Sequence, residues 1–158
     1  VLFGVPYDRI EVVVHPQSIV HSMVEFDDRS VLAQLGVPSM ELPVLFALTF
    51  PDRLEDSRVP RFDPVASSPL TFEPVRHDAF PTLALGIAAG RRGGAAPAVF
   101  NAANETAVAR FLDGTLDFPG IPGAIGATLE RLADHPADDL NALLAADVAA
   151  RAHVREYR

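Results

Sequence analysis

The residues of this chain that could do chemistry gather in the stretch His15-Pro-Gln-Ser-Ile-Val-His21. A histidine can donate and accept hydrogen bonds near neutral pH, and a proline ends the hydrogen bonding of a strand. With Gln17 and Ser18 they indicate a polar corner between two extended segments. Two interpretations stay open: His15 contributes to a binding pocket, or the corner is a hydrogen-bonded structural turn.

Metal binding and nucleophilic catalysis are the chemistries that such a stretch could support. His21 and Glu25 share a strand face but lie about 13 Å apart along it, at roughly 3.3 Å per residue, which is too far for one ion. We therefore expect no metal ligand from this chain. Ser18 or Ser22 could pair with a histidine in a hydrolase, but no nucleophile-elbow sequence or orienting acid accompanies them. The hydrolase stays as a weaker alternative.

Two further polar patterns lie in the second half of the chain. Asn101-Ala-Ala-Asn-Glu105 places two amides and a carboxylate at i, i+3 and i+4 of a mostly apolar helix, on one face. Polar groups in such a cluster usually bind neighbouring elements, so we assign them a structural role. Asp147 and Arg151 have the i, i+4 spacing of a helix-surface ion pair, worth about 0.3 to 0.5 kcal/mol.

Composition excludes several classes of function. All 13 basic residues are arginine and there is no cysteine, so the 158 residues contain no Schiff-base lysine, Walker-type lysine, disulfide or thiolate ligand. The formal net charge of -8 opposes binding to nucleic acid or anionic membrane. Gly90-Arg-Arg-Gly-Gly94 follows no strand and reads as a helix stop rather than a phosphate loop. No apolar run reaches the ~20 residues of a membrane span, and we expect a cytoplasmic protein.

The elements that must position the polar corner are strands. Glu11 to His15 and Ile19 to Phe26 are strand-like, Asp27 to Ser30 forms a turn, and the chain returns over Val31 to Leu35 as a hairpin. Arg29 stands where such a turn favours glycine.

Helices dominate the remainder. Ser39 can cap a helix over Met40 to Phe50 that Pro51 ends. Six prolines between positions 51 and 81 predict a restrained connection. Four helical patterns follow and favour a small bundle; they cover Pro81 to Ala89, Pro97 to Asp113, Ile121 to Ala133, and Asp138 to about Arg155.

These motifs, in this order, resemble the C-terminal part of the 1-deoxy-D-xylulose 5-phosphate reductoisomerase family. The resemblance runs from Val1 to about Arg155, and it is carried by His15 to Ser22, Ser30 to Gly36, Leu70-Thr-Phe72 and Asn101 to Phe111. It implies an α+β chain in which strands and a hairpin from the end of an α/β catalytic domain precede a proline-rich connection and a C-terminal four-helix bundle. The implied division is 1–50 for the end of the central catalytic and dimerisation domain, 51–80 for the connecting segment, and 81–158 for the helical domain.

The resemblance also implies a function. The full enzyme uses NADPH and a divalent cation (Mg, Mn or Co) to convert 1-deoxy-D-xylulose 5-phosphate to 2-C-methyl-D-erythritol 4-phosphate in isoprenoid biosynthesis. His15 would border the substrate pocket, and Pro38 and Met40 match a loop beside it. The metal carboxylates and the nucleotide-binding glycine motif of the family have no counterpart here.

We therefore expect neither catalytic residues nor a complete NADPH or metal site in this chain, and no activity from it alone. Because the chain starts at Val1 and enters in mid-element, we expect a fragment whose partners are the remaining N-terminal half and a second copy in a homodimer. The alternative from another class is a non-catalytic association module that dimerises through its strands.

Overall fold

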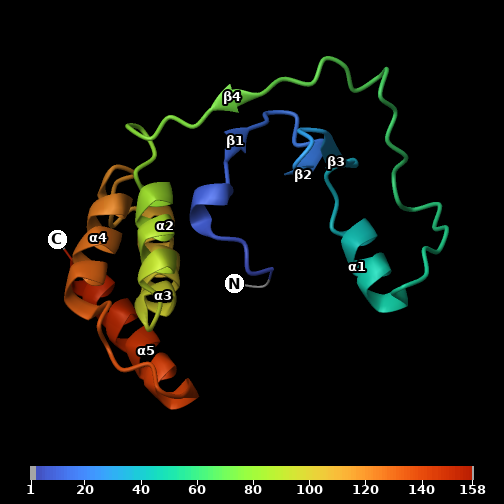
Figure 1. The fold of residues 1–158 in the computed structure, drawn as a ribbon. Coiled ribbons are helices and arrows are strands. Elements are labelled where there is room, and N and C mark those ends of the chain that lie inside the picture. The colour runs from blue at the N-terminus through green and yellow to red at the C-terminus, as the bar shows by residue number, and fades with distance from the viewer. Residues whose placement is uncertain (1–2, 158) are drawn as a thin grey trace. The chain divides into compact units, whose positions relative to one another are not determined.

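The structure is a computed structural model that describes residues 3–157 and divides them into two compact units (Figure 1). One unit combines residues 3–11 with residues 76–157, and the other consists of residues 12–75. The first is helical and the second contains all the strands. The chain is therefore a mixed α+β protein.

The helical unit contains α2 (Thr82–Arg92), α3 (Ala96–Leu112), α4 (Gly120–Leu132) and α5 (Leu140–Glu156). The four spans predicted from the apolar spacing are confirmed within a few residues. Their ends have local causes. Asp139 caps α5 by accepting a hydrogen bond from the Ala142 amide at 2.8 Å, while Gly93 and Gly114 adopt φ values of 69° and 71° just after α2 and α3.

Helix α3 lies at the centre of this unit and packs against α2, α4 and α5. Small side chains face its neighbours, and Ala102, Ala103 and Ala107 are completely buried. Ile125 of α4 and Val154 of α5 fill the space that they leave. Alanine on the buried face permits close approach of the helices, so this unit has a continuous apolar core.

The strand unit contains the antiparallel hairpin of β2 (Val20–Glu25) and β3 (Val31–Leu35). Phe26 closes the turn by accepting from the Arg29 amide at 2.8 Å and donating its own amide to Ser30 at 2.9 Å. Arg29 adopts φ = 67°, the left-handed conformation that glycine favours. Both the hairpin and the special position of Arg29 are therefore confirmed.

Two shorter elements complete the strands. β1 (Val13–Val14) pairs antiparallel with β4 (Glu73–Pro74), placing Val13 opposite Pro74. The strand predicted over Glu11 to His15 is therefore shorter than expected, because its partner β4 is only two residues long. Before it, residues 7 to 9 form the 3-10 helix η1 (Tyr7–Arg9).

Helix α1 (Glu41–Thr49) follows the hairpin, and the Ser39 hydroxyl accepts a hydrogen bond from the Glu41 amide at 3.1 Å at its start. None of its side chains is buried, and Leu48 is 81% exposed. Within residues 3–157 no helix is both long enough and apolar enough to cross a membrane.

Candidate functional site

The corner at His15 is held by a segment far away in the sequence. His15 Nδ1 lies 2.7 Å from the carbonyl oxygen of Thr71. Since a carbonyl oxygen only accepts, Nδ1 carries a proton and donates it. The imidazole also stacks on Phe72, with ring centroids 4.6 Å apart and planes inclined by 17°. These contacts fix the orientation of the ring and, when it is neutral, its tautomer.

The other ring nitrogen of His15 has a different environment. Nε2 is buried and has no hydrogen-bond partner within the described residues 3–157. With the proton on Nδ1, Nε2 of the neutral ring carries a lone pair and is an acceptor. A buried acceptor without a partner is uncommon in folded proteins, which makes this atom the most distinctive one at the corner.

Gln17 reinforces the same connection. Its amide nitrogen donates to the Thr71 hydroxyl at 2.8 Å, and its amide oxygen accepts from the Thr71 backbone amide at 3.2 Å. Ser18 turns the chain with φ = 53° and donates its backbone amide to the His15 carbonyl at 3.0 Å. The corner therefore has the hydrogen bonds of a structural turn in addition to the unpaired Nε2.

The geometry gives no support to a hydrolase. His21 Nδ1 donates to the Gln34 side-chain oxygen at 3.1 Å, and His15 Nδ1 is occupied by Thr71. Neither Ser18 nor Ser22 forms a side-chain hydrogen bond with a histidine in the part of the chain that the structure describes. A serine nucleophile needs such a base within hydrogen-bond reach.

Pro38 and Met40 lie in the loop between β3 and α1. A cavity of about 320 Å³ opens beside this loop, lined by Gly36, Val37 and Ser39 together with α1 and residues of the segment 54–62. Pro38 and Met40 are not in its lining; Pro38 is exposed and Met40 is 73% exposed. The structure brings His15 to Thr71 and Phe72, and no hydrogen bond or ring contact within residues 3–157 joins it to this loop.

Among residues 3–157, no group of three or more histidine, aspartate or glutamate side chains lies close enough together to hold a metal ion. The described residues therefore do not fit a metal centre by themselves, and no ligand to an ion is assigned to them.

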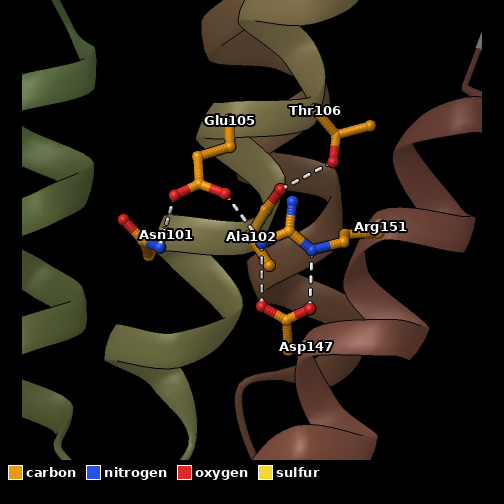
Figure 2. A network of polar contacts seen from close by, with 6 residues as sticks. All are labelled: Asn101, Ala102, Glu105, Thr106, Asp147 and Arg151. Atoms are coloured by element: carbon orange, nitrogen blue, oxygen red, sulfur yellow. Dashed lines mark hydrogen bonds and ion pairs between the residues drawn. The ribbon is translucent and has the colours of Figure 1, made fainter.

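The Asn101–Glu105 pentapeptide forms part of a polar network between α3 and α5, drawn in Figure 2. Asn101 donates to one carboxylate oxygen of Glu105 at 3.1 Å, and Arg151 binds the other at 2.7 Å. Arg151 also holds Asp147 through two hydrogen bonds of 2.6 and 3.0 Å. The ion pair of Asp147 and Arg151 is confirmed, and Glu105 extends it to a second helix.

The charges of this network support one another. The hydrogen bond from Arg151, and then that from Asn101, lowers the pKa of Glu105 below its ordinary value. Hydrogen bonds to Asp147 and then Glu105 raise the pKa of Arg151. Asn104 lies outside the network and lines a separate cleft between α2 and α3. The geometry agrees with a structural role for Asn101 and Glu105.

Three side chains with structural roles had no signal in the sequence motifs. Arg110 donates to the carbonyl oxygens of Val154 and Tyr157 at 2.7 Å each and so binds the end of α5. His153 Nδ1 lies 2.9 Å from the Thr128 hydroxyl. Tyr7 lines the cleft at α2. Each contact joins segments that are far apart in the chain, so local spacing does not identify it.

Comparison with protein families places these features in one context. The family model described as DXP reductoisomerase C-terminal domain matches residues 35–153. The 1-deoxy-D-xylulose 5-phosphate reductoisomerase of Ralstonia nicotianae is 49% identical over 156 residues, which are 99% of this chain and 39% of that protein. The enzyme of the same name from Cupriavidus necator is 50% identical over 155 residues, 98% of this chain and 39% of that protein.

Solved structures give the same result. The reductoisomerase of Zymomonas mobilis in complex with NADPH superposes with a TM-score of 0.90 at 39% identity, covering 98% of this chain and 40% of that one. A DOX-P reductoisomerase in complex with NADPH, fosmidomycin and magnesium gives 0.89 at 34% identity, covering 98% and 41%. The chain spans about two fifths of the length of these relatives. It belongs to the 1-deoxy-D-xylulose 5-phosphate reductoisomerase family and corresponds to the C-terminal part of its members.

Proposed function

We propose that this chain is the C-terminal part of an NADPH- and metal-dependent reductoisomerase that converts 1-deoxy-D-xylulose 5-phosphate to 2-C-methyl-D-erythritol 4-phosphate in isoprenoid biosynthesis. One observation carries the proposal: nearly the whole chain matches reductoisomerases at about 50% identity, and these two relatives have the same name. One similar structure contains NADPH and magnesium together. We assign both to the upstream part of the enzyme, since this chain spans only about two fifths of the length of these relatives.

Within this enzyme we assign the three parts as follows. Residues 1–50 are the end of the central catalytic and dimerisation domain, 51–80 are the proline-rich connecting segment, and 81–158 are a C-terminal four-helix bundle. The packing of α2, α4 and α5 on α3 supports the bundle. The exposed apolar side chains of the β2–β3 hairpin support the idea that residues 1–50 complete a larger domain.

His15, Pro38 and Met40 would border the substrate pocket, while the catalytic groups lie upstream. Thr71 and Phe72 orient the His15 ring, which gives the corner a fixed geometry at the edge of the proposed pocket. Pro38 and Met40 expose apolar surface in the loop before α1, which suits contact with a cofactor or with the edge of the pocket.

Fusion of the chain to the upstream three fifths of the Ralstonia nicotianae enzyme tests this function. The assay follows NADPH oxidation with 1-deoxy-D-xylulose 5-phosphate and Mn²⁺, and the intact Ralstonia enzyme serves as the control. We expect turnover by the fusion and none by the 158-residue chain alone. Turnover by the chain alone, or a folded fusion that binds NADPH and does not turn over, would contradict the proposal.

The second candidate is a non-catalytic association module that dimerises through its strands. An exposed apolar pair on one face of the hairpin favours it, since Val24 is 56% and Leu32 is 67% exposed and the two are cross-strand partners. Sedimentation equilibrium of the chain and of its Leu32→Glu variant separates the candidates. A dimer that Leu32→Glu dissociates, together with an inactive fusion, would favour the module.

A further inference from the structure

We propose that the α5 face, an apolar surface formed by Leu140, Leu144 and Val148, is a contact surface for the upstream part of the same polypeptide. The inference rests on the proposed function for the identity of this partner, because it takes the upstream part to be that of a reductoisomerase. It concerns the surface of the helical unit by itself and gives a partner to a helix that the proposed pocket does not include.

The α5 face consists of large apolar side chains that point away from the core. Leu140, Leu144 and Val148 are 70%, 55% and 66% exposed. Their spacing of four residues places them along one side of the helix over about 12 Å, at 1.5 Å per residue. A single exposed apolar side chain is ordinary, whereas three in one row form a patch of the kind that marks an interaction site.

Helix α5 already packs into the core with its other side. Ala146, Ala150 and Val154 are completely buried among the helices of this unit. A surface helix of this kind normally presents charged and polar side chains on the side opposite to its buried face. The apolar side chains of the α5 face are therefore not needed for the packing of the helical unit.

The exposed side of α5 lacks charge. Its exposed positions between 140 and 152, all of which the structure describes, are Leu140, Asn141, Leu144, Ala145, Val148 and Ala152. At about 100° per residue they fall within one sector of roughly 140°. The two charged residues of this stretch, Asp147 and Arg151, are half-buried and bound to each other. In a chain with 22% charged residues, an uncharged sector favours a covered surface over a solvated one.

The border of the α5 face is mainly acidic. Asp138 and Asp139 are exposed directly before α5, and Glu105 of α3 binds Arg151 three residues beyond Val148. A complementary surface is therefore apolar at its centre and basic at its edge. A second copy of this chain fits poorly, because it would bring the same acidic border and a net charge of -8.

The size of the α5 face also decides against a separate molecule. Burial of one aliphatic side chain removes roughly 60 to 120 Å² of apolar surface from water, so three supply about 200 to 400 Å². A stable interface between two proteins needs about 800 Å² from each partner. A segment of the same polypeptide needs less area, because it is already tethered and does not lose the freedom of a separate molecule on binding.

The reductoisomerases that this chain matches contain such a tethered segment. The chain spans about two fifths of their length, so roughly three fifths lie outside the matching part. The upstream part is therefore an occupant that a face of this small area can hold, and no second molecule is required.

Thiol labelling tests the contact, because the chain has no cysteine of its own. Leu144→Cys places one thiol at the centre of the α5 face, and the matched control Glu130→Cys places one on the exposed side of α4. Each variant is prepared in the 158-residue chain and in the fusion to the upstream three fifths of the Ralstonia nicotianae enzyme. Mass spectrometry of the peptide that contains the new cysteine gives its rate of reaction with N-ethylmaleimide, separately from any cysteine of the upstream part.

We expect the thiol of Leu144→Cys to react more than about tenfold more slowly in the fusion than in the lone chain, because a covered thiol reacts only when the contact opens. The rate for Glu130→Cys should differ by less than about twofold between the two proteins. In the lone chain, the rate for Leu144→Cys should not depend on protein concentration. Circular dichroism should show the same helix content in both variants as in the parent chain.

Equal labelling of Leu144→Cys in the lone chain and in the fusion would overturn the contact. Slower labelling of the lone chain at higher concentration would assign the α5 face to a second copy and would overturn it as well. Cysteine at the aligned position of the intact Ralstonia enzyme repeats the measurement without a fusion joint, and rapid labelling there would have the same meaning.

NADPH oxidation by the same fusion separates this inference from the proposed function. Slow labelling of Leu144→Cys in a fusion without turnover would contradict the assigned reaction and support the contact. Turnover by a fusion in which Leu144→Cys reacts as fast as in the lone chain would support the reaction and overturn the contact.

Discussion

The buried hydroxyl groups of Thr128 and Thr106 lie in the same helical unit but differ in the number of hydrogen bonds that they form. Both are buried and both donate to the carbonyl oxygen four residues earlier, at 2.7 Å to Ala124 and 2.8 Å to Ala102. Thr128 alone accepts a second hydrogen bond. Since its proton is engaged by Ala124, His153 Nδ1 must be the donor. The Thr128 hydroxyl therefore links α4 to α5.

We predict that Thr128→Val lowers the free energy of unfolding by about 1 to 2 kcal/mol, because it leaves the His153 N–H without an acceptor in a partly buried place. Thr106→Val, the matched control, removes only a hydrogen bond within one helix and should cost less than about 1 kcal/mol. Urea denaturation followed by circular dichroism gives both values. Equal losses would show that the bond to His153 contributes nothing.

Glu105 provides a prediction with a pH dependence. Its pKa is lowered below the ordinary 4.5 by hydrogen bonds from Arg151 and Asn101. A carboxyl group with a lowered pKa in the folded state contributes stability above its unfolded pKa, and this contribution is lost as the pH falls through the folded pKa. We expect Glu105→Gln to lower the Tm at pH 7 and to have no effect at a pH well below 4.5.

Glu130→Gln is the control for this measurement, because Glu130 is exposed on α4 and has the same charge. Its Tm should follow that of the parent chain at each pH. Salt at about 1 M should also reduce the Glu105→Gln effect, since the network is exposed and screened. A difference between Glu105→Gln and the parent that persists unchanged at low pH would rule out the ion pair as its cause.

At the scale of the elements, the turn between β2 and β3 contains one residue with a strained backbone conformation. Arg29 holds a left-handed conformation that costs a non-glycine residue roughly 1 to 2 kcal/mol. Glycine would relieve this strain but lose more chain entropy, roughly 0.5 to 1 kcal/mol. We predict that Arg29→Gly stabilises the hairpin by up to about 1 kcal/mol.

Amide hydrogen exchange at Phe26, which donates to Ser30 across the turn, measures this stability. The neighbouring Asp27→Gly change places glycine where the chain has an ordinary conformation, so it should destabilise the same hairpin. Faster exchange in Arg29→Gly than in the parent would contradict the prediction.

The sequence could predict the helices and strands that depend on residues close together in the chain. The four helices of the helical unit follow from apolar spacing and from stops at glycine, and the hairpin follows from alternation and a polar turn. Contacts between segments far apart in the sequence could not be predicted. His15 binds Thr71, which is 56 residues away, and the pairing of Val13 with Pro74 closes a loop of similar length. Such contacts depend on the whole path of the chain, which no local pattern encodes.

The same limit applies to the candidate site. The motif that includes His15 was recognisable, and so was its polar character. Its buried Nε2 and its stacking on Phe72 are properties of the folded corner. The assignment of residues 3–11 to the helical unit is another such property, because Tyr7 lies 75 residues or more from the residues of α2 that surround it.

At the scale of the whole molecule, the two units differ in how much apolar surface they bury. The helical unit has a continuous core around α3. Within residues 12–75, all of which the structure describes, Ile19 is the only large apolar side chain in the buried core. Met40, Leu48 and Leu32 are largely exposed. A unit with so little buried area has little to offset its conformational entropy.

We therefore predict that the units differ in hydrogen exchange when the chain is alone. Amides of α3 and α5 should exchange only through cooperative unfolding, whereas those of α1 and of β2 and β3 should exchange through local opening that costs about 0 to 2 kcal/mol. In the fusion to the upstream part of the Ralstonia enzyme, α1 and the hairpin should gain protection, while α3 and α5 should change little. Because the exposed apolar side chains lie on α1 and the hairpin, protection gained there would locate the surface that the rest of the enzyme covers; slow exchange of the hairpin already in the lone chain would show that this unit is stable without a partner.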